Sequence, residues 1–243
     1  MTSRTSVLAA TAFLLTGSAS AIAADLYGQG MKDVGYAPAP VYSPMGFYLR
    51  GDASWSGNDM GEVYDPRLNT LFRTGIDNTW GGGFGVGYYF SRNVRTDVTF
   101  DWRGTADVTG TTVGGAVMNT GVKSMVTLFN VYYDFDIRSH FTPYIGVGLG
   151  FSRNETSSGG FSSCACTVEF AGAKEWNAAG ALMAGVSAKL RDRLSLDAGY
   201  RYLYMGDAKT GEFVNAAGNA PGSIKINDLN AHEFRIGVRW DIK

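Results

Sequence analysis

Apolar and polar residues alternate with a period of two through eight segments of this chain. Residues 234–240, for example, read FRIGVRW. Successive side chains of a β-strand point to opposite faces, so a period of two predicts strands. The sixth segment is rich in Ala and could by itself be helical, but Gly180, Gly185 and the neighbouring strands favour a strand. The predicted strands cover residues 46–57, 79–90, 93–103, 123–135, 141–152, 175–190, 194–204 and 231–242.

The gaps between the predicted strands alternate between short and long. Tight turns fall at 91–93, 136–140 and 191–193, and polar, Gly-rich segments fill 58–78, 104–121, 153–174 and 205–230. An up-and-down meander with this spacing has all its long loops at one end. The layout predicts an all-β fold, an eight-stranded antiparallel up-and-down transmembrane β-barrel. Such barrels keep the N-terminus and short turns in the periplasm and the long loops outside the cell.

The two faces of the strands distinguish a membrane barrel from a soluble one. A soluble eight-stranded barrel is apolar inside and polar outside. Here one face of nearly every strand is bulky and apolar, and the other carries glycine or charge. The glycine faces at 81–87 and 146–150 would give water nothing to solvate if they pointed outward. The apolar face is therefore expected to meet lipid, and glycine and charge to fill a narrow lumen.

Aromatic residues gather at both ends of the predicted strands. They have the apolar-face parity, as expected for rings at the two membrane interfaces. Trp55, Trp80, Trp102 and Trp176 mark the long-loop ends, and Phe47, Phe90, Phe135 and Trp240 mark the short-turn ends. These residues are predicted to form two aromatic girdles.

Charged residues of both signs lie on the lumen face in equal number. The basic ones are Arg50, Arg95, Arg103, Lys189, Arg201, Arg235 and Arg239, and the acidic ones are Asp52, Asp97, Asp101, Asp134, Asp197, Glu233 and Asp241. Unpaired buried charge is costly, so this set is expected to form an ion-pair network. The network could line a gated ion path. Since eight strands leave room for little more than side chains, a plug that closes the lumen is favoured.

The N-terminal residues read as export and linker segments. Residues 1–23 contain Arg4, a short apolar stretch and a small-residue cleavage site at 21–23, which is typical of a signal peptide. Residues 24–45 are Pro- and Gly-rich and are expected to be a flexible periplasmic segment before one barrel domain at 46–243. Without the signal peptide the chain carries 20 basic and 22 acidic residues, which gives no electrostatic case for binding nucleic acid.

The sequence offers little for catalysis or metal binding. Its two histidines, His140 and His232, fall at a predicted turn and at a strand end, and no catalytic triad or phosphate loop is evident. Cys164 and Cys166 could form a disulfide in an oxidising compartment, although the one-residue spacing strains it. We therefore expect no enzyme activity, no cofactor and no metal.

Several strand motifs resemble one family of surface proteins. They are Gly46-Phe47-Tyr48 with Gly51, Thr142-Pro143-Tyr144-Ile145-Gly146-Val147-Gly148, Leu196-Asp197-Ala198-Gly199-Tyr200-Arg201-Tyr202, and Gly237-Val238-Arg239. Over residues 45–243 the chain resembles the OmpA-like β-barrel domain of alphaproteobacterial outer-membrane proteins, the RopB-type or major Rhizobiales family. Family members commonly end in an aromatic residue that the assembly machinery reads, whereas here Trp240 is followed by three further residues.

The resemblance implies a structural role in the cell outer membrane. The expected protein stabilises the envelope, presents surface loops as an antigen and contacts outer-membrane lipid, lipopolysaccharide and the outer-membrane assembly machinery. Some relatives are joined to peptidoglycan through an Ala-Asp N-terminus, and Ala24-Asp25 matches that dipeptide. The alternative is a small porin-like channel, or a protein that binds or takes up a surface ligand such as hemin.

Overall fold

The computed structural model describes residues 46–61, 63–65, 70–111, 117–137, 139–162, 167–215, 218–220 and 222–242. All of them belong to one compact unit, Tyr42–Lys243. The predicted signal peptide at 1–23, the segment at 24–45 with its candidate tether Ala24-Asp25, and Cys164 and Cys166 lie outside the described residues.

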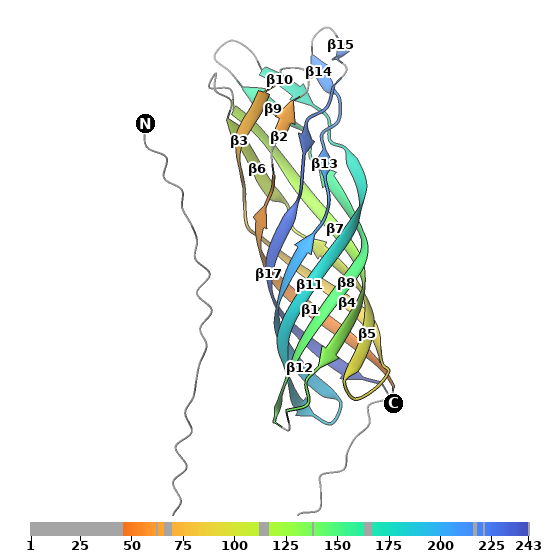
Figure 1. Ribbon diagram of the computed structural model, residues 1–243. Helices are drawn as coiled ribbons and strands as arrows, with labels where there is room; N and C mark the ends of the chain where they lie inside the picture. The colour runs from red at the N-terminus through yellow and green to blue at the C-terminus, as the bar shows by residue number, and fades with distance from the viewer. Residues whose placement is uncertain are drawn as a thin grey trace, which may run out of the picture. The chain divides into compact units, whose positions relative to one another are not determined.

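Eight long strands form a closed antiparallel barrel, as the alternation predicted (Figure 1). In order around the barrel they are β1 (Gly46–Asp59), β4 (Thr79–Tyr89), β5 (Val94–Arg103), β7 (Val117–Asp134), β8 (Phe141–Thr156), β11 (Lys174–Arg191), β12 (Leu194–Tyr204) and β17 (Asn230–Asp241). Each pairs antiparallel with the next, and β17 pairs with β1 to close the circle. Short connections at 90–93 and 192–193, and one that includes 135–137 and 139–140, join strands at one end, which we call the turn end.

The opposite end, the loop end, contains more strand than the sequence predicted. β7 begins at Val117 rather than at 123, and β8 continues to Thr156 rather than 152. The predicted loops also hold β2 (Val63–Asp65), β3 (Thr70–Ile76), β6 (Ala106–Thr111), β9 (Gly159–Ser162), β10 (Thr167–Phe170), β13 (Ala208–Lys209), β14 (Phe213–Asn215), β15 (Gly218–Ala220) and β16 (Lys225–Ile226). We call these nine short strands the β-extension. The expectation of long surface loops was incomplete in this respect.

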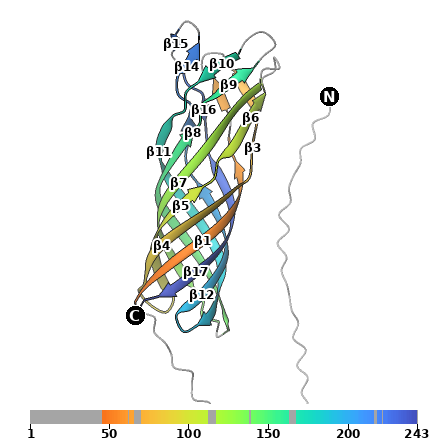
Figure 2. The same cartoon turned by 180° about the vertical axis from the view of Figure 1, so that it is seen from behind.

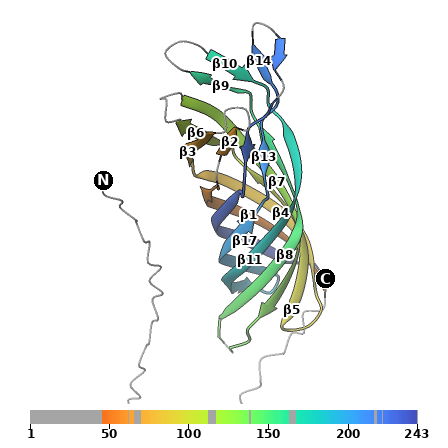
Figure 3. The ribbon, with the colours of Figure 1, turned by 45° about the horizontal axis from the view of Figure 1, so that its top comes forward.

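The β-extension continues the barrel wall and has its own apolar core. β6 pairs with the upper part of β7, β9 pairs with β7 and β10, and β10 pairs with β14 (Figures 2 and 3). Buried apolar side chains at this end are Val63, Val108, Met118, Phe170, Ile224, Ile226 and Leu229. The same cluster reaches down to Val126, Leu128 and Leu203 of the long strands. Apolar packing therefore closes the lumen toward the loop end.

The faces of the long strands have the predicted orientation. Along β5, Arg95, Asp97 and Asp101 are buried, whereas Phe100 and Trp102 are about half exposed. A contiguous apolar exterior of this extent is unusual for a soluble monomer. Exposed outward-facing residues include Leu49, Phe84, Val86, Val98, Phe100, Phe129, Val131, Ile145, Val147, Leu149, Leu182, Phe234, Ile236 and Val238. Across the described part of the chain we find no helix with the length and apolar character to cross a membrane.

Candidate functional site

The lumen between the turn end and the apolar cluster is filled by buried ionic side chains. Six arginines and six carboxylates lie there, and each arginine has a carboxylate within ion-pair distance. The residues are Arg50, Arg95, Arg103, Arg201, Arg235 and Arg239 with Asp52, Asp97, Asp101, Asp134, Asp197 and Glu233. They come from five of the eight long strands, β1, β5, β7, β12 and β17, and meet because all of them have lumen parity.

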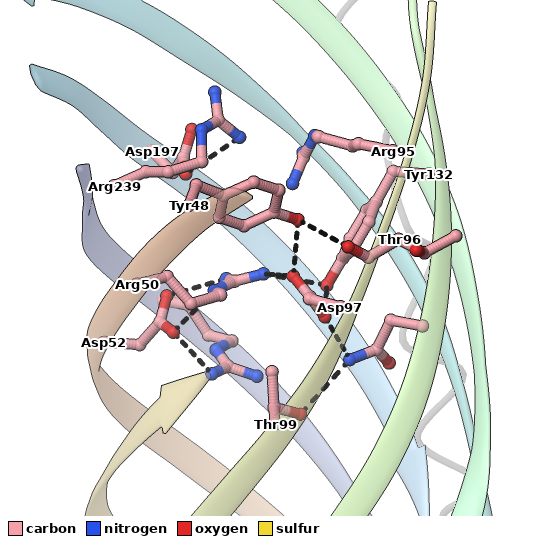
Figure 4. A network of polar contacts seen from close by, with 12 residues as sticks. Tyr48, Arg50, Asp52, Arg95, Thr96, Asp97, Thr99, Tyr132, Asp197 and Arg239 are labelled. Carbon is pink, nitrogen blue, oxygen red and sulfur yellow. Dashed lines mark hydrogen bonds and ion pairs between the residues drawn. The ribbon is translucent and has the colours of Figure 1, made fainter. Parts of the chain in front are cut away.

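One group of contacts centres on Arg50 of β1 (Figure 4). Its guanidinium lies 2.8 Å from Asp52 Oδ1 and 2.9 Å from Asp97 Oδ2, and it donates a hydrogen bond of 2.8 Å to the Tyr132 hydroxyl. The Tyr48 hydroxyl donates to the same Asp97 oxygen at 3.0 Å. The charge of Asp97 is thus neutralised and its lone pairs are occupied, which a buried carboxylate requires.

A second group lies further toward the loop end around Arg201 of β12. Arg201 is 1% exposed and reaches Asp101 and Glu233 at 2.6 Å each. Arg103 approaches Glu233 at 3.1 Å. Arg235 joins the two groups, with 2.9 Å to Asp101 and 3.2 Å to Asp52. The contacts therefore form one connected network across the lumen.

Two further pairs lie near the turn end. Arg95 Nε is 3.0 Å from Asp134 Oδ2, and Arg239 Nη1 is 3.4 Å from Asp197 Oδ2. The Ser187 hydroxyl donates a short hydrogen bond to the other oxygen of Asp197. The first pair links β5 to β7, and the second links β17 to β12. Each ion pair therefore joins two strands that are neighbours in the barrel wall.

Tyrosine rings separate these pairs from the Arg50 group. The Arg95 guanidinium lies 4.0 Å from the Tyr132 ring centre and 4.9 Å from that of Tyr144, and Arg239 lies 5.5 Å from that of Tyr48. These are cation–π distances. The aromatic faces stabilise the arginines and occupy space that water would otherwise fill.

Lys189 and Asp241 lie at the rim of the turn end rather than inside the buried network. Lys189 is exposed where the register between β11 and β12 shifts at Lys189/Arg191. Asp241 is half-buried and accepts a hydrogen bond of 3.1 Å from the Tyr89 hydroxyl. From the sequence both residues are predicted to lie in the lumen network, although the predicted strand limits put each of them one residue from a strand end.

The sequence did not single out the lumen tyrosines or Asn130. Tyr48 fits because Gly87 opposes it on β4, where an added Cβ would overlap the Tyr48 ring. Asn130 donates 2.7 Å to Asp97 Oδ1 and lies over Gly148 in the same way. Tyr48 and Asn130 thus each lie opposite a glycine of the neighbouring strand. This pairing could have identified them from the sequence only if the register between the strands had been known.

The network leaves little free volume. One cavity among Arg50, Asp52 and Arg201 measures about 10 Å³, and one beside Arg103 and Met205 about 20 Å³. Each is close to the minimum that holds a single water molecule. Within the described residues, the lumen is filled by the ionic network, and the apolar cluster closes it toward the loop end.

The predicted girdle tryptophans all point outward. Exposed fractions are 36% for Trp55, 73% for Trp80, 52% for Trp102, 70% for Trp176 and 52% for Trp240. Trp55 opposes Trp80 in register and stacks on Phe234 with 6.2 Å between ring centres. His232 also faces outward, and its Nδ1 lies 2.5 Å from the Tyr200 hydroxyl. His232 thus lies in an aromatic surface cluster. Within the described ranges no set of three or more His, Cys, Asp or Glu is arranged to hold a metal ion.

A closed eight-stranded barrel with an apolar exterior and an ionic interior is the architecture of outer-membrane proteins. The family model described as "Outer membrane protein beta-barrel domain" matches residues 9–241. The chain belongs to the outer membrane protein beta-barrel family. Membership places it in the outer membrane.

The relatives of this outer membrane barrel carry different functional names. An uncharacterized protein of Brucella abortus is 30% identical over 276 residues, covering 95% of each chain. A Rickettsia prowazekii protein named "Putative adhesin" is 27% identical over 216 residues, covering 81% of this chain and 87% of its own. The crystal structure of OprG from Pseudomonas aeruginosa superposes with a TM-score of 0.55 at 15% identity, over 82% of this chain and 98% of that one. At that identity OprG supports the fold alone.

Proposed function

We propose that this outer membrane barrel is a structural envelope protein whose sealed lumen supports a folded surface element, the β-extension. In this proposal the turn end faces the periplasm and the β-extension faces the outside of the cell. The observation that carries it is the lumen, where six arginines and six carboxylates pair below an apolar cluster. A conducting pore favours unpaired or one-signed charge and continuous water.

Single-channel recording in a planar bilayer tests the sealed lumen. The purified full-length barrel is expected to give no discrete current steps under conditions in which a porin control conducts. Reproducible openings from several preparations would support the porin-like alternative instead, and a current blocked by hemin would support ligand uptake.

Cysteine labelling in intact cells tests the orientation. In a background with Cys164 and Cys166 replaced by serine, a membrane-impermeant maleimide is expected to label Ser158→Cys and to spare Asp192→Cys. Both positions lie in turns outside the long strands, and Asp192 belongs to the turn end. Labelling of Asp192→Cys alone would reverse the proposed orientation.

Two finer features belong to the same proposal. The strand motifs favour the RopB-type alphaproteobacterial group within the family. A covalent tether through Ala24 of the mature chain would connect the barrel to peptidoglycan and contribute to envelope integrity. Muropeptide mass spectrometry of the native envelope is expected to reveal a fragment linked to Ala24, and its consistent absence would remove the tether from the proposal.

Adhesion is the second candidate function. The β-extension offers a folded surface element with a buried core, and relatives from Rickettsia carry the name "Putative adhesin". Cells that display the protein are expected to bind a host-cell layer more than cells that display the barrel with residues 157–172 shortened to a tight turn. Equal binding by both would argue against adhesion through this hairpin.

A further inference from the structure

A polar hollow of about 590 Å³ lies on the outer face of the loop end, where β6 and β7 meet the β3–β4 turn. β3, β6 and β7 lie side by side in this part of the wall (Figure 2). Sites for small molecules commonly have volumes of about 300–1,000 Å³. Along β6, Asp107 and Thr109 are exposed and Val108 between them is buried. Because its exposed lining is polar, the hollow opens to water rather than to lipid.

Gly121 of β7 keeps the hollow open. It opposes Asp107 in register, and its carbonyl accepts a hydrogen bond of 2.8 Å from the backbone N–H of Ser157. A Cβ at Gly121 would lie 2.6 Å from Thr105 Cγ2 and 3.3 Å from Ser157 Oγ. A side chain at this position would therefore fill the space between Asp107 and Ser157. The Thr120 hydroxyl donates 3.0 Å to the Ser157 carbonyl, so this side of the hollow is held in place before a ligand binds.

Two aspartates line the hollow without a cation beside them. The Asp77 N–H donates 3.0 Å to the Asp107 carbonyl, which continues the register that places Ile76 opposite Val108. Like charges directly opposite each other on neighbouring strands are destabilising. Neither carboxylate forms an ion pair with a described residue, and the described lining contains no Lys, Arg or His. Two opposed negative charges without a partner in this part of the chain point to a cation from outside.

The remaining lining suits a hydroxylated ligand. Hydroxyl and amide side chains both donate and accept hydrogen bonds, as the hydroxyl groups of a sugar do. The side chains of this kind are Thr105, Thr109, Asn119, Ser157 and Ser158. A bare metal ion would occupy a small part of the volume, and no group of three or more His, Cys, Asp or Glu among the described residues could hold one. A polyamine would use the acceptors of the lining and leave its donors without partners.

We propose that this hollow binds an amino sugar. The ammonium group lies between the carboxylates of Asp77 and Asp107, and the ring hydroxyls bond to the Ser, Thr and Asn side chains around Gly121. Hydrogen bonds from an ammonium to a carboxylate are charge-assisted and stronger than those between neutral groups. The site adds a ligand to the structural role proposed above. With the β-extension outside the cell, the sugar reaches it from the external medium.

Titration calorimetry of the full-length barrel in detergent tests the proposal. The probe is the β-1,4-linked disaccharide of glucosamine at a slightly acidic pH, where its amines are protonated. It is expected to bind at least about tenfold more tightly than cellobiose, which has a hydroxyl in place of each amine. The double variant Asp77→Asn, Asp107→Asn is expected to bind the probe at least about tenfold more weakly. The control variant Asp59→Asn, Glu169→Gln removes the same charge from exposed positions outside the hollow and is expected to bind like the wild type.

Thermal unfolding separates loss of the ligand from loss of the fold. Because Asp77→Asn, Asp107→Asn removes a repulsion, the variant is expected to unfold at the same temperature as the wild type or a higher one. A lower unfolding temperature, absence of binding by the wild type, or an equal loss of affinity in the control would overturn the site. Equal binding of cellobiose, or of spermidine, would overturn the amino sugar as its ligand. Micelles leave both ends of the barrel accessible, so these outcomes do not depend on cellular orientation, the sealed lumen or adhesion.

Discussion

The buried ion pairs of the lumen share partners, so they are not independent of one another. Arg50, Arg201 and Arg235 each contact two carboxylates, so a change at one position alters several pairs. Removing one member of a buried pair leaves a charge that neither water nor a partner stabilises. Side-chain identity in the lumen is therefore constrained by charge as well as by volume.

Glu233→Gln is expected to lower the free energy of unfolding by about 3–5 kcal/mol. Glu233 is fully buried between Arg201 and Arg103, and the change removes its charge while keeping its shape. Denaturant titration in phospholipid vesicles measures the effect. The control Glu175→Gln removes a half-exposed partner of Lys209 and is expected to cost less than about 1 kcal/mol. Similar losses from both would show that the lumen pairs behave like surface pairs.

Gly237→Ala is expected to destabilise the barrel by roughly 1–3 kcal/mol. A Cβ at Gly237 would overlap the Asp52 carboxylate, which must then move away from Arg50 and Arg235. Gly51→Ala serves as the control because Gly51 faces outward and a Cβ there meets no atom within 4 Å. The two variants are compared by thermal unfolding in the same detergent. If Gly51→Ala lowers the unfolding temperature as much as Gly237→Ala does, the destabilisation comes from replacing a strand glycine and not from displacing Asp52.

At the scale of elements, the strand pattern was readable where one face is lipid-exposed and the other is not. The eight long strands have that contrast, and their predicted limits agree with the structure within one or two residues at most ends. In the β-extension, single buried residues such as Val108 and Ile226 alternate with exposed polar neighbours. Its strands are two to seven residues long, too short for a period to be distinguished from chance.

Phe170→Ala is expected to unfold the β9–β10 hairpin while the barrel stays intact. Phe170 is 1% exposed and opposes Gly159 across the hairpin, and loss of a buried phenyl ring costs about 3–5 kcal/mol. Limited proteolysis is expected to cut the variant within 157–172, and the eight long strands are expected to keep their heat-dependent shift in electrophoresis. Thr109→Ala, an exposed change on β6, is the control. Loss of the whole barrel would mean that the β-extension is needed for the membrane domain.

The whole molecule has two solvents, lipid around the middle of the barrel and water at its ends. The outward residues of the middle are apolar, and exposed aromatic side chains lie toward both ends of the long strands. The β-extension continues beyond the loop end of the long strands (Figure 1). In lipid every backbone polar group must be paired within the protein, and closure through β1 and β17 achieves this for the long strands. The membrane therefore selects the closed barrel, and the lumen side chains then have to fill it.

Val147→Arg is expected to destabilise the folded barrel in vesicles by about 2–4 kcal/mol. Val147 faces outward between Val131 and Leu182 in the middle of the wall, where a charge would be placed in hydrocarbon. Phe90→Arg lies at the turn end, where the expected cost is about 0–1 kcal/mol. Urea titration of both variants in vesicles provides the measurement. Equal costs at the two positions would contradict the membrane level assigned to the wall.

The sequence alone determined the eight long strands, their order and which of their side chains face outward. These follow from a two-residue period, turn spacing and aromatic placement, which are properties of short segments and need no knowledge of partners. Only the tertiary structure decided that Arg50 meets Asp97, that Tyr48 lies over Gly87, and that the loop segments build a β-extension. These features depend on the register between strands far apart in the chain, and a one-residue shift in register would change every partner.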